Sequence, residues 1–279
     1  MFVDAHHHLW AKARGDYPWM DGAPEVLQRD YLAADLAPLF GRFGIGRSVL
    51  IQAAPTQEET DFLLNIAQET DFIAGVVGWL DMEDENFPER LAYYAGKPKF
   101  VGVRPMLQDI ADDDWILSPA VMRALREVAK HGLAFDVLIY PRHLPQIVKM
   151  LEQLPELRAV IDHLAKPPIA KGICTSWRDG IEQVAAFKNV YCKISGMITE
   201  ADPDGWTVDD LRPFVAHTVK MFGPERLIFG SDWPVCLTAG NYSDVLAATM
   251  AALPRELAHD RRIFGENAIR FYDLKHEVT

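Results

Sequence analysis

Short runs of β-branched and aromatic residues recur along the chain, and a longer segment with helical spacing of apolar residues separates each run from the next. This spacing suits parallel β-strands joined by right-handed helical crossovers, because such a crossover needs about a dozen residues or more. The pattern predicts a parallel sheet covered by helices. Its eight predicted strands lie at residues 2–8, 47–53, 72–80, 99–105, 133–140, 157–163, 189–195 and 226–232.

The intervening segments carry signals for the start and end of helices. Thr56, with Glu59 three residues later, predicts a capping box. Ser118 and Pro119 predict an N-cap followed by proline at the first helical position. This helix should end at Gly132, and a predicted strand follows it at once.

The chain length and the distribution of reactive residues indicate how this sheet is arranged. A chain of 279 residues with 49% hydrophobic residues fits one TIM barrel. An open, doubly wound sheet is the alternative for the same strand–helix cycle. Several predicted strands end in reactive residues, however, and a barrel brings all of these ends to one rim. We therefore expect a (β/α)8 barrel, as a single domain over residues 1–279.

Composition narrows the class of partner. The formal net charge of -12 leaves no broad cationic surface, so nucleic acids and anionic membranes are poor partners and a small molecule is expected. The longest run of apolar residues and glycine, 72–80, is too short to span a bilayer. The three cysteines form no CxxC pair, which favours reduced thiols in a cytoplasmic protein. The oligomeric state is left open.

Three consecutive histidines lie in the first predicted strand, in the segment VDAHHHLW. Because side chains alternate along a strand, Asp4, His6 and His8 should face the inside of the barrel. The residues between them should face the surrounding helices. Two imidazoles at this spacing can converge on one substrate or ion, and neutral imidazole binds zinc well. Two histidines that only form hydrogen bonds would also explain the pair.

Two further strand ends point to the same place. His163 ends the sixth predicted strand, and Asp232 ends the eighth, which adjoins the first strand in a closed barrel. A rim carboxylate by itself could simply cap a loop. Next to His6 and His8, we expect Asp232 to accept a proton from water, as the hydrolysis of an ester or lactone requires of a general base.

Cationic residues also occur at or just past predicted strand ends. Arg104, Lys166 and Lys193 follow the fourth, sixth and seventh strands. Such cations could stabilise a developing oxyanion or hold the hydroxyl and carboxylate groups of a substrate. A surface ion pair explains Lys193 equally well. Glu200, in the loop after the seventh strand, could bind a hydroxyl group of the substrate or orient a cation.

Aromatic residues cluster in the long segment after the first predicted strand. Trp10 and Trp19 lie there, in a loop that functional residues of a barrel often occupy. We expect both indoles to form a wall of the substrate pocket. Core packing is the alternative.

The chain contains the segments DAHHHLW, GDYPW, GVRP, DHLAKPP, KISG with the following TEAD, GSDWP and FGENAIRFY. Taken in order, these segments resemble the motifs of the amidohydrolase superfamily over nearly the whole chain, and within it those of the sugar-lactone hydrolases. The resemblance implies a distorted (β/α)8 barrel with substrate at its C-terminal rim, Asp232 as the residue that activates water, and His6, His8 and His163 in the site.

The resemblance also indicates how many metal ions the site could bind. Binuclear members of the superfamily use a carboxylated lysine on strand four and histidines on strands five and six, but here strand four ends in Arg104 and strand five has no histidine. At most one Zn²⁺ is therefore implied, at His6 and His8 with His163 and Asp232 nearby. The sugar-lactone branch includes enzymes that need no metal, so a metal-independent site is equally open.

We therefore expect hydrolysis of a sugar-acid lactone, such as L-fucono- or L-rhamnono-lactone, to the aldonate. One alternative is a metal-dependent decarboxylase of the same superfamily, which would place a further histidine such as His143 on the metal. The other is a non-catalytic barrel that binds sugar acids, which the presence of the complete histidine and aspartate set disfavours.

Overall fold

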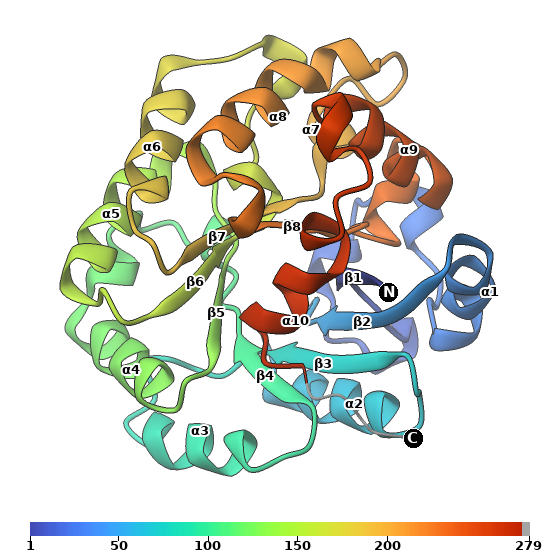
Figure 1. Cartoon of the computed structure of the whole chain (residues 1–279). Helices are drawn as coiled ribbons and strands as arrows, with labels where there is room; N and C mark the ends of the chain where they lie inside the picture. Colours follow the sequence, from blue (N-terminus) through green and yellow to red (C-terminus); the bar gives the residue numbers. More distant parts are fainter. Residues whose placement is uncertain (275–279) are drawn as a thin grey trace.

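The computed structural model describes residues 1–274 and contains a parallel sheet of eight strands, ordered β1 to β8 and surrounded by helices (Figure 1). Each predicted strand is present, so the predicted (β/α)8 barrel is confirmed. Residues 275–279 of the predicted domain lie outside the described residues. The strands are β1 Phe2–His7, β2 Ile45–Ile51, β3 Ile73–Gly78, β4 Phe100–Val103, β5 Ala134–Val137, β6 Arg158–Ile161, β7 Val190–Ile194 and β8 Leu227–Phe229.

The helices form the outer layer. None of those in the described residues is long and apolar enough to cross a bilayer. Their bounds are α1 Ala33–Phe43, α2 Gln57–Gln68, α3 Phe87–Ala95, α4 Pro119–Lys130, α5 Leu144–Gln153, α6 Thr175–Ala185, α7 Met197–Glu200, α8 Val208–Phe222, α9 Tyr242–Ala252 and α10 Asn267–Phe271.

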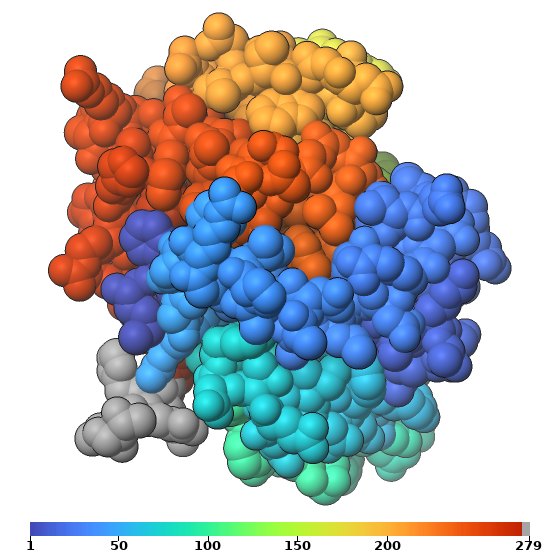
Figure 2. All heavy atoms as spheres, turned by 90° about the vertical axis from the view of Figure 1, so that its right-hand side faces the viewer, coloured from blue at the N-terminus to red at the C-terminus, as the bar shows by residue number. Residues whose placement is uncertain are grey.

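The barrel closes just beyond the short strand β8. The backbone N–H of Asp232 donates to the carbonyl of His6 at 2.8 Å, and that of His8 donates to the carbonyl of Trp233 at 2.7 Å. Figure 2 shows this side of the molecule, where segments from the start of the chain (blue) lie against segments from its end (orange and red). This closure places the two ends of the predicted site next to each other.

Strand β1 does not alternate regularly. Its pairing with β2 matches Asp4 with Ser48 and His7 with Leu50, so three steps along β1 correspond to two along β2. Such an extra residue is a β-bulge, and it reverses the faces of the side chains on its two sides. Beyond the bulge, His7 packs against Phe40 of α1 in the helical layer, as predicted.

Before the bulge the prediction was wrong. Asp4 points to the outer layer, where it accepts a hydrogen bond from the hydroxyl of Tyr242 in α9 at 3.0 Å. Val3 and Ala5 instead face the barrel interior, in an apolar cluster with other strands and with Phe271 of α10. Only with the bulge can this strand keep apolar residues in the lower barrel and still place two histidines at the rim.

The N-terminus of α2 forms only half of the predicted capping box. The Thr56 hydroxyl accepts a hydrogen bond from the backbone N–H of Glu59 at 3.2 Å, as predicted. The Glu59 carboxylate does not return this bond. It is fully buried and accepts the backbone N–H groups of Ala53 and Ala54, at 3.0 and 2.8 Å, in the loop that follows β2.

Glu59 should make stability depend on pH. Burial raises the pKa of this carboxyl to about 7, against an ordinary value of 4.5. The folded state therefore favours the protonated form, and its contribution, present below pH 4.5, is lost as pH rises through 7. We expect Glu59→Gln, which cannot ionise, to abolish a loss of about 3 kcal/mol between about pH 5 and 8.

Urea unfolding at both pH values measures this effect. Glu58→Gln is the matched control, because this neighbouring side chain lies outside the buried carboxylate site and is more accessible to solvent. The assignment to Glu59 fails if both variants keep the pH dependence of the unchanged protein.

Candidate active site

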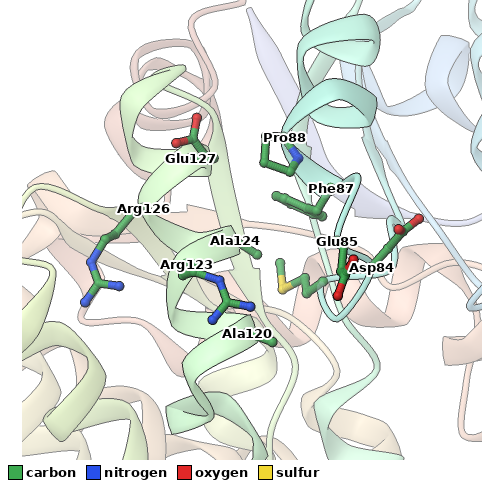
Figure 3. A pocket seen from close by; sticks show the side chains of 10 residues that line it. Asp84, Glu85, Phe87, Pro88, Ala120, Arg123, Ala124, Arg126 and Glu127 are labelled. Atoms are coloured by element: carbon green, nitrogen blue, oxygen red, sulfur yellow. The ribbon is translucent and has the colours of Figure 1, made fainter.

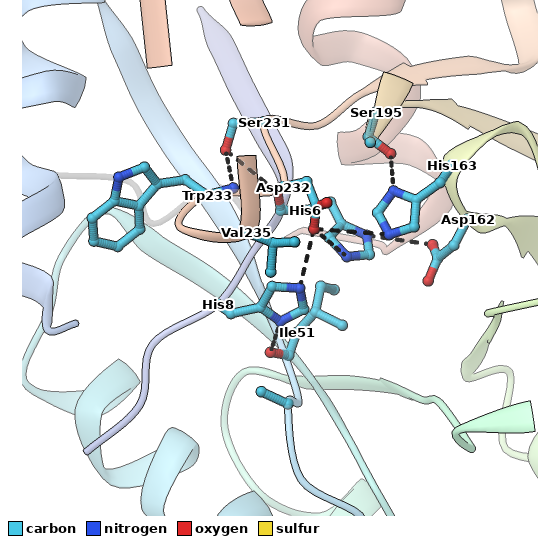
Figure 4. Close-up of polar contacts among 12 residues, drawn as sticks. His6, His8, Ile51, Asp162, His163, Ser195, Ser231, Asp232, Trp233 and Val235 are labelled. Carbon is cyan, nitrogen blue, oxygen red and sulfur yellow. Dashed lines mark hydrogen bonds and ion pairs between the residues drawn. The ribbon is translucent and has the colours of Figure 1, made fainter. Parts of the chain in front are cut away.

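Three imidazoles surround the carboxylate of Asp232 at the C-terminal end of the barrel (Figure 4). The Nε2 atoms of His8, His6 and His163 lie 3.3, 3.8 and 3.8 Å from its Oδ1. These side chains come from the ends of β1, β6 and β8, and all four residues are buried, with at most 4% of each exposed. The structure thus brings together the four residues that the sequence placed in one site.

Asp232 is held in an unusual backbone conformation with φ of +57°. Aspartate tolerates this left-handed region better than most residues. Burial alone would raise the pKa of its carboxyl, but the neighbouring His163, His8 and Lys166 outweigh burial and lower it. Asp232 is therefore ionised at neutral pH, as a general base must be.

His163 begins a left-handed turn of four residues, 163–166, in which no residue is glycine. Such a turn is costly and persists only where its surroundings hold it. The indole N–H of Trp177 donates to the carbonyl of Leu164 at 2.7 Å, and His163 Nδ1 lies 2.8 Å from the Ser195 hydroxyl. Burial lowers the pKa of His163 to about 4, so its ring is neutral at neutral pH.

The hydrogen bonding of His8 defines which of its nitrogens is free. Nδ1 lies 2.9 Å from the carbonyl oxygen of Ile51, which can only accept. The ring therefore carries a proton on Nδ1, and Nε2 faces Asp232 with its lone pair unless it is protonated too. Two electron-rich atoms 3.3 Å apart favour a cation between them, either a proton or a metal ion.

The donor set fits a single zinc ion. A tetrahedral zinc with bonds of about 2.1 Å places its ligand atoms about 3.4 Å apart, close to the separations of the three Nε2 atoms from Asp232. One candidate ligand group is His6, His8 and Asp232, whose ligand atoms all lie within 4.8 Å of one another. A second group of the same kind joins His6 and His163 with Asp162.

Arg104 lies beside this cluster, where strand β4 ends. Its guanidinium Nη1 is 3.3 Å from His6 Nε2 and 3.2 Å from an Asp162 oxygen, and Nη2 donates to Gln52 Oε1 at 3.0 Å. Only 3% of the residue is exposed. Arg104 therefore presents a fixed positive charge at the floor of the site.

The position of Lys193 differs from the sequence prediction. We expected it to contact the substrate or to lie in a surface ion pair, but it is fully buried. Its Nζ lies 2.5 Å from an Asp136 oxygen, 2.9 Å from an Asp162 oxygen and 3.1 Å from His6 Nδ1. The Lys193 ammonium is surrounded by these three groups. Lys193 therefore contacts His6 from the barrel interior and is not accessible to a substrate.

The two buried aspartates were missed by the sequence reasoning. Asp162 directly precedes His163 and joins both cations of the site, and Asp136 accepts a hydrogen bond from the Tyr272 hydroxyl at 2.8 Å. Burial would raise the pKa of Asp162, but Lys193 and the other neighbours hold it well below its ordinary value. The sequence signal for Asp162 was its position directly before His163 at the end of a predicted strand.

Lys166 and Glu200 lie at the more open edge of the site. Their charged atoms are 3.7 Å apart, and their side chains are 18% and 22% exposed. Burial raises the pKa of Glu200 although Lys166 opposes it. Both residues lie where a substrate could reach them, and their predicted contact with substrate remains a prediction.

Of the two tryptophans, Trp10 cannot form a pocket wall. It has no exposed surface, its indole N–H donates to the Arg29 carbonyl at 2.8 Å, and it packs edge-on against Tyr31. The core alternative is therefore correct for Trp10. Trp19 is partly exposed and donates to the Ala53 carbonyl at 2.8 Å, beside the end of β2. Its predicted role stays a prediction.

His143 stands apart from the cluster. Its Nδ1 accepts the backbone N–H of Tyr140 at 3.1 Å, and its Nε2 lies 3.1 Å from Asp113. Both nitrogens thus lie against groups in the loops around β5. Among the described residues, His143 belongs to neither candidate ligand group, so the feature that a decarboxylase would need is not formed here.

Two surface hollows lie outside the candidate site. One, of about 230 Å³, is lined by residues of α3 and α4 such as Phe87 and Arg123 (Figure 3). The other, of about 520 Å³, lies at the opposite end of the barrel and is lined by Arg158 and Tyr272 among others. Neither contains a residue of the histidine–aspartate cluster.

Comparison with known proteins adds independent findings. The sequence profile of the family described as Amidohydrolase matches residues 3–274. An L-fucono-1,5-lactonase from Burkholderia ambifaria is 45% identical over 98% of this chain and 95% of its own. A second one, from Burkholderia multivorans, is 36% identical over 98% of this chain and 96% of its own. A crystal structure of an amidohydrolase from Burkholderia multivorans with bound zinc superposes with a TM-score of 0.93, at 35% identity over 99% of this chain and 100% of that one.

Proposed function

The chain belongs to the amidohydrolase family, and from this premise we propose that it hydrolyses a sugar-acid lactone, with L-fucono-1,5-lactone the first candidate. The observation that carries the proposal is the side-chain oxygen of Asp232 that lies within 3.3 to 3.8 Å of three imidazoles. Two L-fucono-1,5-lactonases that match almost the full chain support this substrate class. The proposed enzyme acts on a small molecule in the cytoplasm, in keeping with its three free cysteines.

Asp232 is the proposed general base. Water loses a proton to its carboxylate as the oxygen adds to the lactone carbonyl, and the resulting tetrahedral oxyanion needs nearby positive charge or hydrogen-bond donors. Arg104 supplies a fixed charge at the floor of the site. When the intermediate collapses, the ring C–O bond breaks and the ring oxygen takes up the proton, giving the aldonic acid and, after ionisation, the aldonate.

Lys166 and Glu200 are the proposed contacts for the hydroxyl groups of the sugar. An ammonium donates and a carboxylate accepts, so the pair can recognise two neighbouring hydroxyls from one side. His163, neutral at neutral pH, can hydrogen-bond the reacting groups next to Asp232. Trp19 is the proposed apolar contact for the sugar ring.

His6, His8 and Asp232 would hold a zinc ion, with His163 nearby. When bound there, Zn²⁺ lowers the pKa of a water ligand to roughly 7 and polarises a carbonyl. The roles proposed for Asp232, Arg104 and Lys166 do not depend on it.

A panel of 1,4- and 1,5-lactones in a pH-indicator assay tests the proposal. We expect L-fucono-1,5-lactone to be hydrolysed fastest among them, and assays with and without a strong chelator, paired with elemental analysis, report the metal requirement. If no sugar lactone is hydrolysed, the proposal is wrong. Saturable binding of the same lactones without hydrolysis would support a non-catalytic sugar-acid-binding barrel instead.

A further inference from the structure

His6 is enclosed by two buried cations. Lys193 Nζ lies 3.1 Å from its Nδ1, and Arg104 Nη1 lies 3.3 Å from its Nε2. Ammonium and guanidinium groups donate hydrogen bonds and accept none. All three residues are buried, with at most 3% of each exposed. Each nitrogen of the His6 imidazole therefore faces a cationic group that can only donate a hydrogen bond to it.

A neutral imidazole has only one nitrogen lone pair that can accept a hydrogen bond. If Nδ1 accepts from Lys193, the ring proton is on Nε2. If instead Nδ1 carries the proton, directed at the Asp162 oxygen 3.4 Å away, then Nε2 accepts from Arg104. In the first arrangement Nε2 carries the proton, and in the second its lone pair is engaged by Arg104, so a metal ion can bind this nitrogen only by displacing one of these contacts.

His8 differs in this respect. Its Nδ1 proton is fixed on the Ile51 carbonyl, so Nε2 is free for a metal or a proton. The two histidines of the HxH motif are therefore unequal as ligands, although their positions suit the same zinc ion. The difference arises from residues of β7 and the end of β4, not from the motif itself.

We propose that Lys193 and Arg104 compete with a metal ion for His6, and that Lys193 is the stronger competitor. A metal on Nε2 requires a proton on Nδ1, and this proton would face the ammonium of Lys193, whose Nζ lies 3.1 Å away. Arg104 has other acceptors, on Asp162 and Gln52, and can give up its contact with His6. Lys193 is thus a positioning residue that keeps the affinity of the site for zinc low.

Removing the ammonium should convert the site into a stronger zinc site. In Lys193→Met, the His6 Nδ1 proton can be accepted by Asp162, and a carboxylate behind a metal-bound histidine commonly changes metal affinity by about 10–100-fold. We expect the affinity for Zn²⁺, measured without substrate by competition with a chromophoric chelator, to rise within that range.

Lys166→Met is the control for charge. It removes the same charge near Asp232 without contact to His6, so we expect a change of only a few-fold. Asp136→Asn combined with Lys193→Met removes the ammonium together with a carboxylate partner. This double variant should show the same gain if Lys193→Met alone fails to fold.

His6→Gln in the Lys193→Met background tests whether the gain in zinc affinity depends on His6. We expect it to abolish the gain in zinc affinity, which a general change in charge or packing would not predict. The inference is overturned if Lys193→Met binds zinc no better than Lys166→Met, or if the gain persists without His6. Because no lactone enters these measurements, the proposed hydrolysis can fail or hold independently of them.

Discussion

Asp232→Asn should lower kcat for lactone hydrolysis by a factor on the order of 10²–10⁴, the usual contribution of a general base. Asparagine keeps the shape of the side chain but cannot take up the proton of the attacking water. It also tolerates the positive φ of this position as well as aspartate does. The backbone hydrogen bond from residue 232 to the His6 carbonyl is unaffected, so the closure of the barrel should persist.

Steady-state kinetics and thermal unfolding together test this assignment. We expect kcat to fall while the unfolding temperature stays close to that of the unchanged protein. Asp204→Asn, which alters an exposed aspartate in the loop after α7, should affect neither quantity. Normal turnover by the Asp232→Asn variant would show that another group activates the water.

The strands and the convergence of the site could be predicted because they depend on local patterns and on a simple topology. Each apolar run between helical segments becomes a strand, and a parallel barrel places all strand ends at one rim. For that reason His6, His163 and Asp232, far apart in the sequence, could be placed together before the structure was known. The N-cap at Ser118 is similarly local, and its hydroxyl accepts the Val121 N–H as expected.

The wrong predictions concern residues whose position depends on the pairing of strands or on how deeply the side chain is buried. The bulge in β1 depends on the register with β2, which the alternation of residues in one strand does not contain. Asp4 was therefore assigned to the wrong face. Lys193 lies at a strand end like Arg104, but its long side chain turns into the barrel, where the missed Asp136 and Asp162 compensate its charge. Only the partner strands reveal that a buried cation is tolerated there.

Gly196→Ala should reduce kcat/KM by about 100-fold, because it displaces a site residue from its position. A Cβ at Gly196 would lie 2.7 Å from Nδ1 of His163 and 2.8 Å from its Cγ. The imidazole must then move and lose its contact with the Ser195 hydroxyl. Activity depends on placement to within about an ångström, so the loss should appear mainly in the chemical step.

Gly132→Ala separates this displacement from backbone strain. Gly132 and Gly196 have nearly the same φ, +65° and +61°, but no atom lies within 4 Å of a Cβ built at Gly132. The left-handed conformation should cost each alanine variant about 1–2 kcal/mol of stability. Only Gly196→Ala should lose activity, as measured by lactone kinetics and urea unfolding on both variants. Equal activity in the two would mean that His163 does not need its present position, and its place in the catalytic site would have to be given up.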